Sequence, residues 1–179
     1  MTASYLSIIQ SCFNNIRNDI IKTPLVLNKR LSIQHEANIY LKREDLQNVR
    51  SFKIRGAINK IKKIGDKEVV TASAGNHAQG VAYSCRTLNK KGHIFVPETT
   101  PIQKIDRIRY FGGDNISIEI VGNNFNECLH KSLEYSTKTQ KPFIHPYDDQ
   151  DIINGQATIA HEIYKKMEPD AMITCVCGG

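Results

Sequence analysis

The chain has 179 residues, of which 40% are hydrophobic and 23% are charged, and its formal net charge is +6 at pH 7. These proportions are those of a globular domain and exclude a disordered, collagenous or fibrous protein. No apolar run approaches the roughly 18 residues that a membrane-spanning helix needs, and the N-terminus lacks the layout of a signal peptide. We therefore expect a cytoplasmic protein with no membrane partner.

The cysteines and the basic residues give weak indications of binding. The five cysteines fit no disulfide framework, and the pair Cys175 and Cys177 has no second pair or close histidine, so no metal site is expected. The basic residues are scattered and are not interleaved with aromatic residues. A solvated surface explains this charge better than a nucleic-acid interface does.

The first third of the chain predicts two helices separated by extended segments. Apolar residues at helical spacing over residues 5–20 predict an amphipathic helix, and Pro24 begins an extended stretch. Residues 38–42 alternate like a short strand. A second helix is predicted from Phe52, with Ser51 as its N-cap.

The rest of the chain alternates between strands and helices. A helix over residues 124–137 is expected to stack Phe125, Leu129 and Leu133 on one face, and residues 171–176 form the last apolar strand. Such alternation predicts βαβ units, and so an α/β fold with a mostly parallel sheet. The predicted strands are 69–72, 93–96, 116–120, 143–144 and 171–176, and the helices between them are 76–88, 102–111, 124–137 and 155–166.

Two strand ends are candidate ligand sites, because ligands of α/β folds bind at the carboxyl ends of strands. Residues 71–77 lead from a strand through small residues into a helix, whose free N–H groups suit a carboxylate or a phosphate. Ser73 and Asn76 add a hydroxyl and an amide there, although both are equally typical of ordinary helix starts. Gly178 and Gly179 follow the last strand, a pattern typical of a phosphate cradle and of a simple turn.

Lys53 is the candidate nucleophile. It stands in the first turn of a predicted helix, where a cation is unfavourable, and an aromatic neighbour could lower its pKa by desolvation. Taken alone, Lys53 is more simply interpreted as a surface lysine. The chain has neither a G-x-x-x-x-G-K-[ST] nor a G-x-G-x-x-G pattern, so ATP and NAD are poorly supported.

Taken together, these motifs resemble those of the threonine dehydratases (threonine ammonia-lyases). The stretches are 41–47 (LKREDLQ), 51–57 (SFKIRGA), 73–80 (SAGNHAQG), 97–101 (PETTP), 143–149 (FIHPYDD) and 155–158 (GQAT). The family uses pyridoxal 5′-phosphate and has the fold type of the tryptophan synthase β subunit, fold type II. Residues 42–45 and 71–73 look more like the biosynthetic branch, which serves isoleucine synthesis, than the catabolic one.

The resemblance implies a set of cofactor contacts. Lys53 matches the lysine that holds pyridoxal 5′-phosphate as a Schiff base and, once freed, takes the proton from the substrate Cα. Phe52 matches the neighbour of the pyridine ring, and Asn76 matches the residue that bonds the ring hydroxyl oxygen. Gly178 and Gly179 match the start of the loop that binds the cofactor phosphate.

The resemblance also implies an amino-acid substrate whose carboxylate binds at the end of the first strand of the alternating region. Ser73 is further implied in catalysis. The expected reaction converts L-threonine to 2-oxobutanoate and ammonia, with L-serine as a second substrate and a homo-oligomer as the full-length assembly. The residues implied for the carboxylate are Ser73, Ala74, Gly75, Asn76 and His77.

The implied architecture has three-layer parallel sheets with helices on both faces, in two domains. Residues 53–151 are expected to form the small α/β domain, and residues 1–52 and 152–179 an incomplete large, cofactor-binding domain. Because the chain stops inside the glycine-rich loop, the second domain is expected to be truncated. The alternatives are a serine racemase or serine dehydratase of the same family, and a catalytically inactive remnant of such an enzyme.

Three positions depart from the family pattern. Cys177 stands where the first glycine of the phosphate loop is usual, and its side chain would crowd a close backbone approach. Cys175 replaces a usual proline, and Ala157 replaces a usual glycine.

Overall fold

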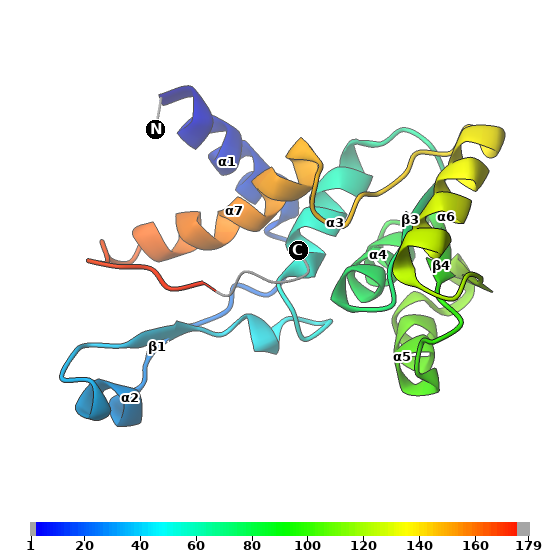
Figure 1. The fold of residues 1–179 in the computed structure, drawn as a ribbon. Helices are drawn as coiled ribbons and strands as arrows, with labels where there is room; N and C mark the ends of the chain where they lie inside the picture. Colours follow the sequence, from blue (N-terminus) through cyan, green and yellow to red (C-terminus); the bar gives the residue numbers. More distant parts are fainter. Residues whose placement is uncertain (1–2, 175–179) are drawn as a thin grey trace.

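The computed structural model describes residues 3–174, with side chains from Tyr5 onward. Figure 1 shows the strands and helices of residues 68–139 on one side of the molecule, and those of residues 3–42 on the other. Helix α3 (Lys53–Lys63) lies between these two groups, and α7 (Gln150–Tyr164) runs from α3 along the side that holds the N-terminal elements. The chain therefore has an α/β part built around a sheet and a second part that is mainly helical.

The sheet of the α/β part is parallel. Its strands β3 (Glu68–Ala72), β4 (Lys91–Val96) and β5 (Ile116–Ile120) lie side by side in that order. On the other side of β3, Phe143 forms a parallel bridge with Val70. The chain thus leaves β3 towards one side for β4 and later returns to the opposite side. This arrangement creates a switch point at the carboxyl end of β3, where ligands of open α/β sheets bind.

Helices cover both faces of this sheet. Helices α4 (Asn76–Thr87) and α5 (Ile102–Gly112) pack on one face, and α6 (Phe125–Thr139) packs on the other. Along β4, Ile94 and Val96 join the cluster with α4 and α5, whereas Phe95 joins the cluster with Cys128 of α6. This alternation is the two-residue period of a strand buried on both faces. The expected three-layer arrangement is confirmed for this part of the chain.

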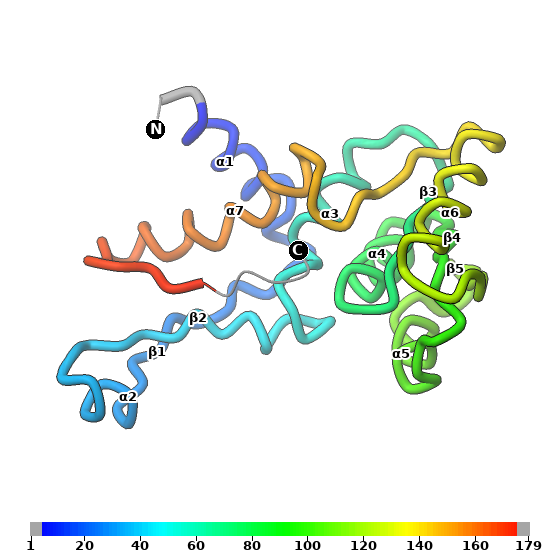
Figure 2. The backbone as a smooth tube through the Cα atoms, in the orientation of Figure 1, coloured from blue at the N-terminus to red at the C-terminus, as the bar shows by residue number. Residues whose placement is uncertain are grey.

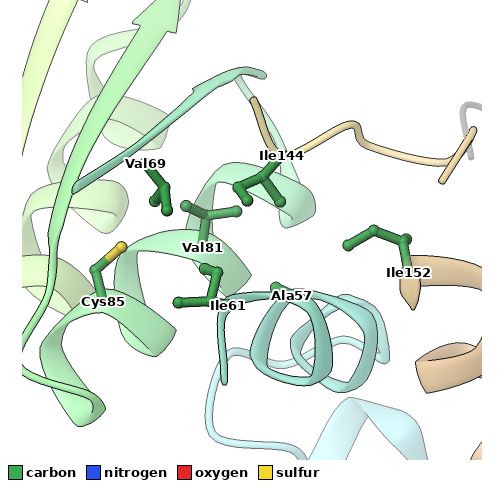
Figure 3. Packing of buried hydrophobic residues seen from close by; sticks show 7 residues of the cluster. All are labelled: Ala57, Ile61, Val69, Val81, Cys85, Ile144 and Ile152. Atoms are coloured by element: carbon green, nitrogen blue, oxygen red, sulfur yellow. The ribbon is translucent and has the colours of Figure 1, made fainter. Parts of the chain in front are cut away.

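A central cluster joins α3 to its neighbours, and Figure 3 shows its side chains meeting between the helices and β3. Helix α3 approaches α7 very closely, since a Cβ atom on Gly155 would lie 2.6 Å from Gly56 Cα. The crossing of these two helices therefore requires glycine at both positions. The members of the cluster are Ala57, Ile61, Val69, Val81, Cys85, Ile144 and Ile152.

The N-terminal region forms a helix and an extended arm. Helix α1 (Ala3–Ile16) packs against α7, and the arm consists of β1 (Leu25–Leu27), α2 (Lys29–Gln34) and β2 (Tyr40–Lys42). Figure 2 shows the arm projecting away from the parallel sheet. Strands β1 and β2 pair antiparallel, so the arm departs from the parallel sheets expected throughout. A 3-10 turn, η1 (Glu44–Leu46), connects the arm to the segment before α3.

Two predicted helix starts are wrong. The N-cap of α3 is Phe52, and the buried hydroxyl of Ser51 has no hydrogen-bond partner within the described range. Helix α7 begins at Gln150, five residues before the expected Gly155, because the Asp149 carboxylate accepts from two backbone N–H groups of its first turn. An aspartate in this position is a strong N-cap.

The last predicted strand is also wrong, whereas the helix predicted over residues 124–137 is present as α6. The buried face of α6 carries Cys128 and Ser132, while Phe125 and Leu133 are 37% and 43% exposed. Residues 171–174 form no strand, and Ile173 is fully exposed. A strand needs a neighbour to satisfy its backbone groups, and no strand among residues 3–174 pairs with this segment. Residues 175–176 of the same prediction lie outside the described residues.

Candidate active site

Lys53 is the first residue of α3, and its side chain is buried. Only 5% of the residue is exposed, and its Nζ donates to the Pro146 carbonyl oxygen at 2.8 Å. The same Nζ lies 5.5 Å from the centre of the Phe52 ring. Burial lowers the pKa of the Lys53 amine, which raises the fraction of free amine near neutral pH. A buried amine with a lowered pKa is a nucleophile and a proton acceptor.

The loop after β3 presents unpaired backbone N–H groups. Helix α4 has Gly75 as its N-cap, with no side-chain cap, and Ser73 Oγ accepts from Gly75 N at 3.2 Å. The N–H groups of Asn76 and His77 have no acceptor within residues 3–174. The Asn76 side chain is exposed and makes no hydrogen bond in that range. Together with the helix dipole, these groups favour an anion such as a carboxylate.

His77 lies beside Lys53 as a buried, neutral imidazole. Its Nε2 is 3.1 Å from the Ile144 carbonyl oxygen, which can only accept, so the proton is assigned to Nε2. Burial, together with the charges of Lys53 and His145, lowers its pKa to about 4 against the opposing effect of that hydrogen bond. The remaining Nδ1 is buried and has no partner in the described part of the chain. It is therefore a hydrogen-bond acceptor still to be satisfied.

The segment Ile144–Pro146 connects the elements of the site. The Ile144 carbonyl accepts from Thr71 Oγ1 at 2.8 Å as well as from His77, and the Pro146 carbonyl accepts from Lys53. This segment runs beside β3 at the switch point. The sequence predicts a strand at residues 143–144, of which the structure has a single bridge between Phe143 and Val70. It predicts no contact with Lys53 or His77, because these contacts are made through backbone oxygens that have no side-chain signature.

A buried cluster of charged groups, hereafter the ion cluster, holds the other face of α3. Arg55 is fully buried, and its guanidinium lies 2.7 Å from Glu44 Oε1 and 2.8 Å from Glu162 Oε1. Lys42 Nζ lies 2.5 Å from Glu162 Oε2. Burial raises the pKa of Glu162, but hydrogen bonds from Arg55 and Lys42 outweigh it and hold the pKa below its usual range. Lys42, Glu44 and Arg55 stand within the motifs quoted above, but neither their pairing nor Glu162 was predicted.

The structure brings most of the predicted site residues together. Lys53 and the loop 73–77 meet at the carboxyl end of β3, and a Cβ on Gly80 would lie only 3.2 Å from the Lys53 backbone. Phe52 and Asn76 lie at the starts of the two helices that form this site. The predicted phosphate-binding residues Gly178 and Gly179, and the unusual Cys175 and Cys177, lie outside the described residues.

Comparison with known families decides the assignment. The sequence profile described as "Pyridoxal-phosphate dependent enzyme" matches residues 16–179. This chain belongs to the pyridoxal-phosphate-dependent enzyme family. Its parallel sheet with helices on both faces is the α/β fold of fold type II, as expected from the sequence.

The chain is similar to threonine dehydratases within this family. It is 45% identical over 169 residues to "L-threonine dehydratase biosynthetic IlvA" of Halalkalibacterium halodurans, covering 92% of this chain and 41% of the relative. The Bacillus subtilis protein of the same description is 46% identical over 177 residues, covering 96% of this chain and 42% of the relative. The chain thus spans about 40% of the length of these curated relatives.

Solved structures agree with this placement. The processed form of threonine deaminase isoform 2 from Solanum lycopersicum superposes with a TM-score of 0.86 at 39% identity, covering 94% of this chain and 47% of that one. Serine racemase from Dictyostelium discoideum gives a TM-score of 0.82 at 29% identity, covering 92% of this chain and 54% of that one.

The described residues of this family member fit pyridoxal 5′-phosphate. An aldehyde needs an unprotonated amine, which the burial of Lys53 favours, and a negatively charged ligand suits the uncapped start of α4. The unsatisfied His77 Nδ1 adds a hydrogen-bond acceptor close by.

Within residues 3–174, no group of histidine, cysteine or acidic side chains is arranged to hold a metal ion. No helix in that range is long and apolar enough to cross a bilayer.

Proposed function

We propose that the protein carrying this chain is a pyridoxal-phosphate-dependent L-threonine dehydratase, which converts L-threonine to 2-oxobutanoate and ammonia in isoleucine biosynthesis. The observation that carries the proposal is the buried Lys53 amine next to the uncapped start of α4. Similarity to the biosynthetic dehydratases supports the choice of threonine. The proposal includes the cytoplasm as compartment, a homo-oligomeric assembly, and the division into a small domain over 53–151 and a large domain from 1–52 and 152–179.

Four groups of the chain would hold the cofactor. Lys53 would bind it through its amine, Phe52 would lie near its ring, and Asn76 would donate to its ring hydroxyl oxygen. Gly178 and Gly179 would begin the phosphate-binding loop. When bound, the cofactor supplies a conjugated ring that withdraws electrons from the substrate Cα.

The chain's own residues bind and orient the amino acid. Its carboxylate would accept hydrogen bonds from the free N–H groups at the start of α4, including those of Asn76 and His77. Lys53 Nζ would then accept the Cα proton, which its burial favours because a free amine is needed for this step. His77 stays neutral in the same region, so it adds no second positive charge beside Lys53.

Trapping with borohydride tests the assignment of Lys53. Reduction of the cofactor-loaded protein fixes pyridoxal phosphate on the lysine that holds it, and peptide mapping by mass spectrometry then identifies this residue. We expect the label on Lys53 and its loss in Lys53→Ala. Lys63→Ala, which changes an exposed lysine of the same helix, is the matched control and should keep the label on Lys53. A label on another lysine, or no label, would overturn the proposal.

The products distinguish the reaction from its relatives. With L-threonine, the full protein should release equal amounts of 2-oxobutanoate and ammonia, and Lys53→Ala should release neither. Conversion of L-serine to D-serine without a keto acid would instead favour a racemase, a class that the similarity to the Dictyostelium structure makes the second candidate. A protein that carries the cofactor on Lys53 but forms none of these products would contradict both.

A further inference from the structure

The ion cluster around Arg55 has no net formal charge, and every N–H group of the Arg55 guanidinium makes a hydrogen bond. Arg55 and Lys42 contribute two positive charges, and Glu44 and Glu162 contribute two negative ones. A guanidinium has five N–H groups. Those of Arg55 make five hydrogen bonds, to Glu44 Oε1 and Oε2, to Glu162 Oε1 and Oε2, and to Thr158 Oγ1, at 2.7 to 3.2 Å.

The start of α3 lacks an N-cap side chain, and this cluster is one of the contacts that hold it. Phe52 makes no side-chain cap, and the Ser51 hydroxyl has no partner among residues 3–174. Gln156 Oε1 of α7 accepts from Gly56 N at 3.0 Å, and the remaining hydrogen bonds of this turn with α7 and η1 come from Arg55. Arg55 lies in that turn, two residues after Lys53. Its two carboxylate partners come from η1 and α7, so the first turn is held against two elements that are distant in sequence.

The same contacts also fix the acceptor of the Lys53 amine. Pro146, whose carbonyl accepts from Lys53 Nζ, precedes α7 by only four residues. Arg55 ties α7 to α3 through Glu162, and Gly56 and Gly155 allow the helices to touch. Arg55 therefore contributes to the position of the backbone that carries Lys53 relative to α7, which follows the segment that receives its hydrogen bond.

We propose that Arg55 is a positioning residue for Lys53, acting through Glu44 and Glu162 to hold the amine in its reactive place. The proposal rests on the proposed role of Lys53 as the cofactor lysine. Arginine is needed here because a planar guanidinium spans two carboxylates at once, whereas a lysine ammonium at the same place binds as a single point charge. A residue with only a structural role would change the stability of the protein and leave the reactivity of Lys53 in folded molecules unchanged.

The test compares Lys53 reactivity in three variants of the full protein, each first checked for folding by circular dichroism. Arg55→Lys keeps the positive charge but loses the planar guanidinium that spans two carboxylates. Glu162→Gln keeps the shape of the side chain and removes its negative charge. Ile61→Val is the matched control, since it loosens the buried face of α3 two turns away from Lys53. Competitive acetylation across pH, followed by peptide mass spectrometry, gives the reactivity and the pKa of Lys53 without cofactor. Borohydride trapping gives the rate at which pyridoxal phosphate attaches.

We expect Arg55→Lys to slow attachment of the cofactor to Lys53 by up to about 100-fold, the loss that misplacing a reacting group by about 1 Å can cause. Glu162→Gln should act in the same direction, and Ile61→Val should match the wild type. If Arg55→Lys does not fold, Glu162→Gln decides the question by itself. Wild-type attachment rates and an unchanged Lys53 pH profile in the folded variants would overturn the positioning role. Failure of the wild type to label at Lys53 would instead overturn the proposed function, so the two failures are distinguishable.

Discussion

The amine of Lys53 donates a 2.8 Å hydrogen bond to the carbonyl oxygen of Pro146, 93 positions further along the chain. This bond joins the start of α3 to the segment that runs beside β3 at the switch point of the sheet. A carbonyl oxygen accepts a hydrogen bond from an amine whether the amine is charged or neutral, so this bond holds Lys53 in place in either protonation state. Burial then determines the balance between the two forms.

Because the pKa of Lys53 is lowered, the free energy of unfolding should vary with pH in the alkaline range. In the unfolded chain the amine titrates near 10.4. Because its pKa in the folded protein is lower, raising the pH removes the proton from the folded state first, and the unfolded state then binds more protons. The free energy of unfolding should therefore increase as the pH rises from the lowered pKa towards 10.4.

Urea unfolding at several pH values measures this effect, with Lys53→Met as the comparison. Methionine preserves the bulk and the burial of the side chain and removes the titrating group. The difference in unfolding free energy between the wild type and Lys53→Met should move in favour of the wild type with rising pH. A difference that does not change between neutral and alkaline pH would contradict the burial argument.

The lowered pKa of His77 predicts how the free energy of unfolding changes at acidic pH. Its pKa is about 4 in the folded protein and about 6.5 in the unfolded chain, so acidification protonates the unfolded state first. The protein should lose stability as the pH falls from 6.5 towards 4, by up to about 3 kcal/mol at 1.36 kcal/mol per pH unit of pKa shift. His77→Gln, which keeps a donor for the Ile144 carbonyl, should flatten this slope.

The control for this measurement is His130→Gln, because the His130 side chain is 71% exposed on α6. Removing this histidine should leave the acid slope of the wild type in place. If His77→Gln and His130→Gln change the slope equally, the buried imidazole is not its source.

The sequence was sufficient where local pattern determines structure. The strand predicted over residues 116–120 matches β5 residue for residue, and the helix start predicted at Asn76 matches α4. Both follow from alternating apolar residues and from small residues placed after a buried strand. Lys53 is the opposite case: taken alone it is most simply interpreted as a surface lysine, and this interpretation is wrong, because the folded chain buries the side chain and lowers the pKa of its amine.

The sequence was insufficient where the outcome depends on a distant partner. Arg55 and Glu162 carry charges that, taken singly, are best interpreted as solvated, and only the crossing of α3 and α7 buries them together. Serine is a residue type that often forms N-caps, but Ser51 does not cap α3, because the helix begins one residue later than this cap requires. An apolar run such as 171–174 predicts a strand, yet it forms one only when a neighbouring strand supplies hydrogen bonds.

The close contact between α3 and α7 predicts that replacing Gly155 strongly lowers the free energy of unfolding. In Gly155→Ala, the new Cβ would lie 2.6 Å from Gly56 Cα and 2.7 Å from the Arg55 carbonyl oxygen, both of them backbone atoms that cannot move aside singly. We expect a loss of roughly 2 to 3 kcal/mol in unfolding free energy, the range of overpacked cores. Gly65→Ala is the matched control, because a Cβ there meets nothing within 4 Å. Equal stability of the two variants would contradict the close crossing.

Replacing Asn76 should weaken cofactor binding without changing the stability of the cofactor-free protein. Its side chain is exposed and makes no hydrogen bond within the described range, so Asn76→Ala should leave the unfolding free energy of the cofactor-free protein within about 0.5 kcal/mol of the wild type. The same change should weaken cofactor binding by about tenfold, the value of one hydrogen bond of about 1.4 kcal/mol.

Asn126→Ala is the matched control, since Asn126 is also an exposed asparagine in the first turn of a helix, α6. Titration of each cofactor-free variant with pyridoxal 5′-phosphate, followed by visible absorption, gives the dissociation constants. Because neither side chain makes a hydrogen bond within residues 3–174, a difference in affinity between the two variants reports on the position of the ligand. Equal affinities would place the cofactor ring away from the start of α4, and would leave the free N–H groups there as the site of the substrate carboxylate alone.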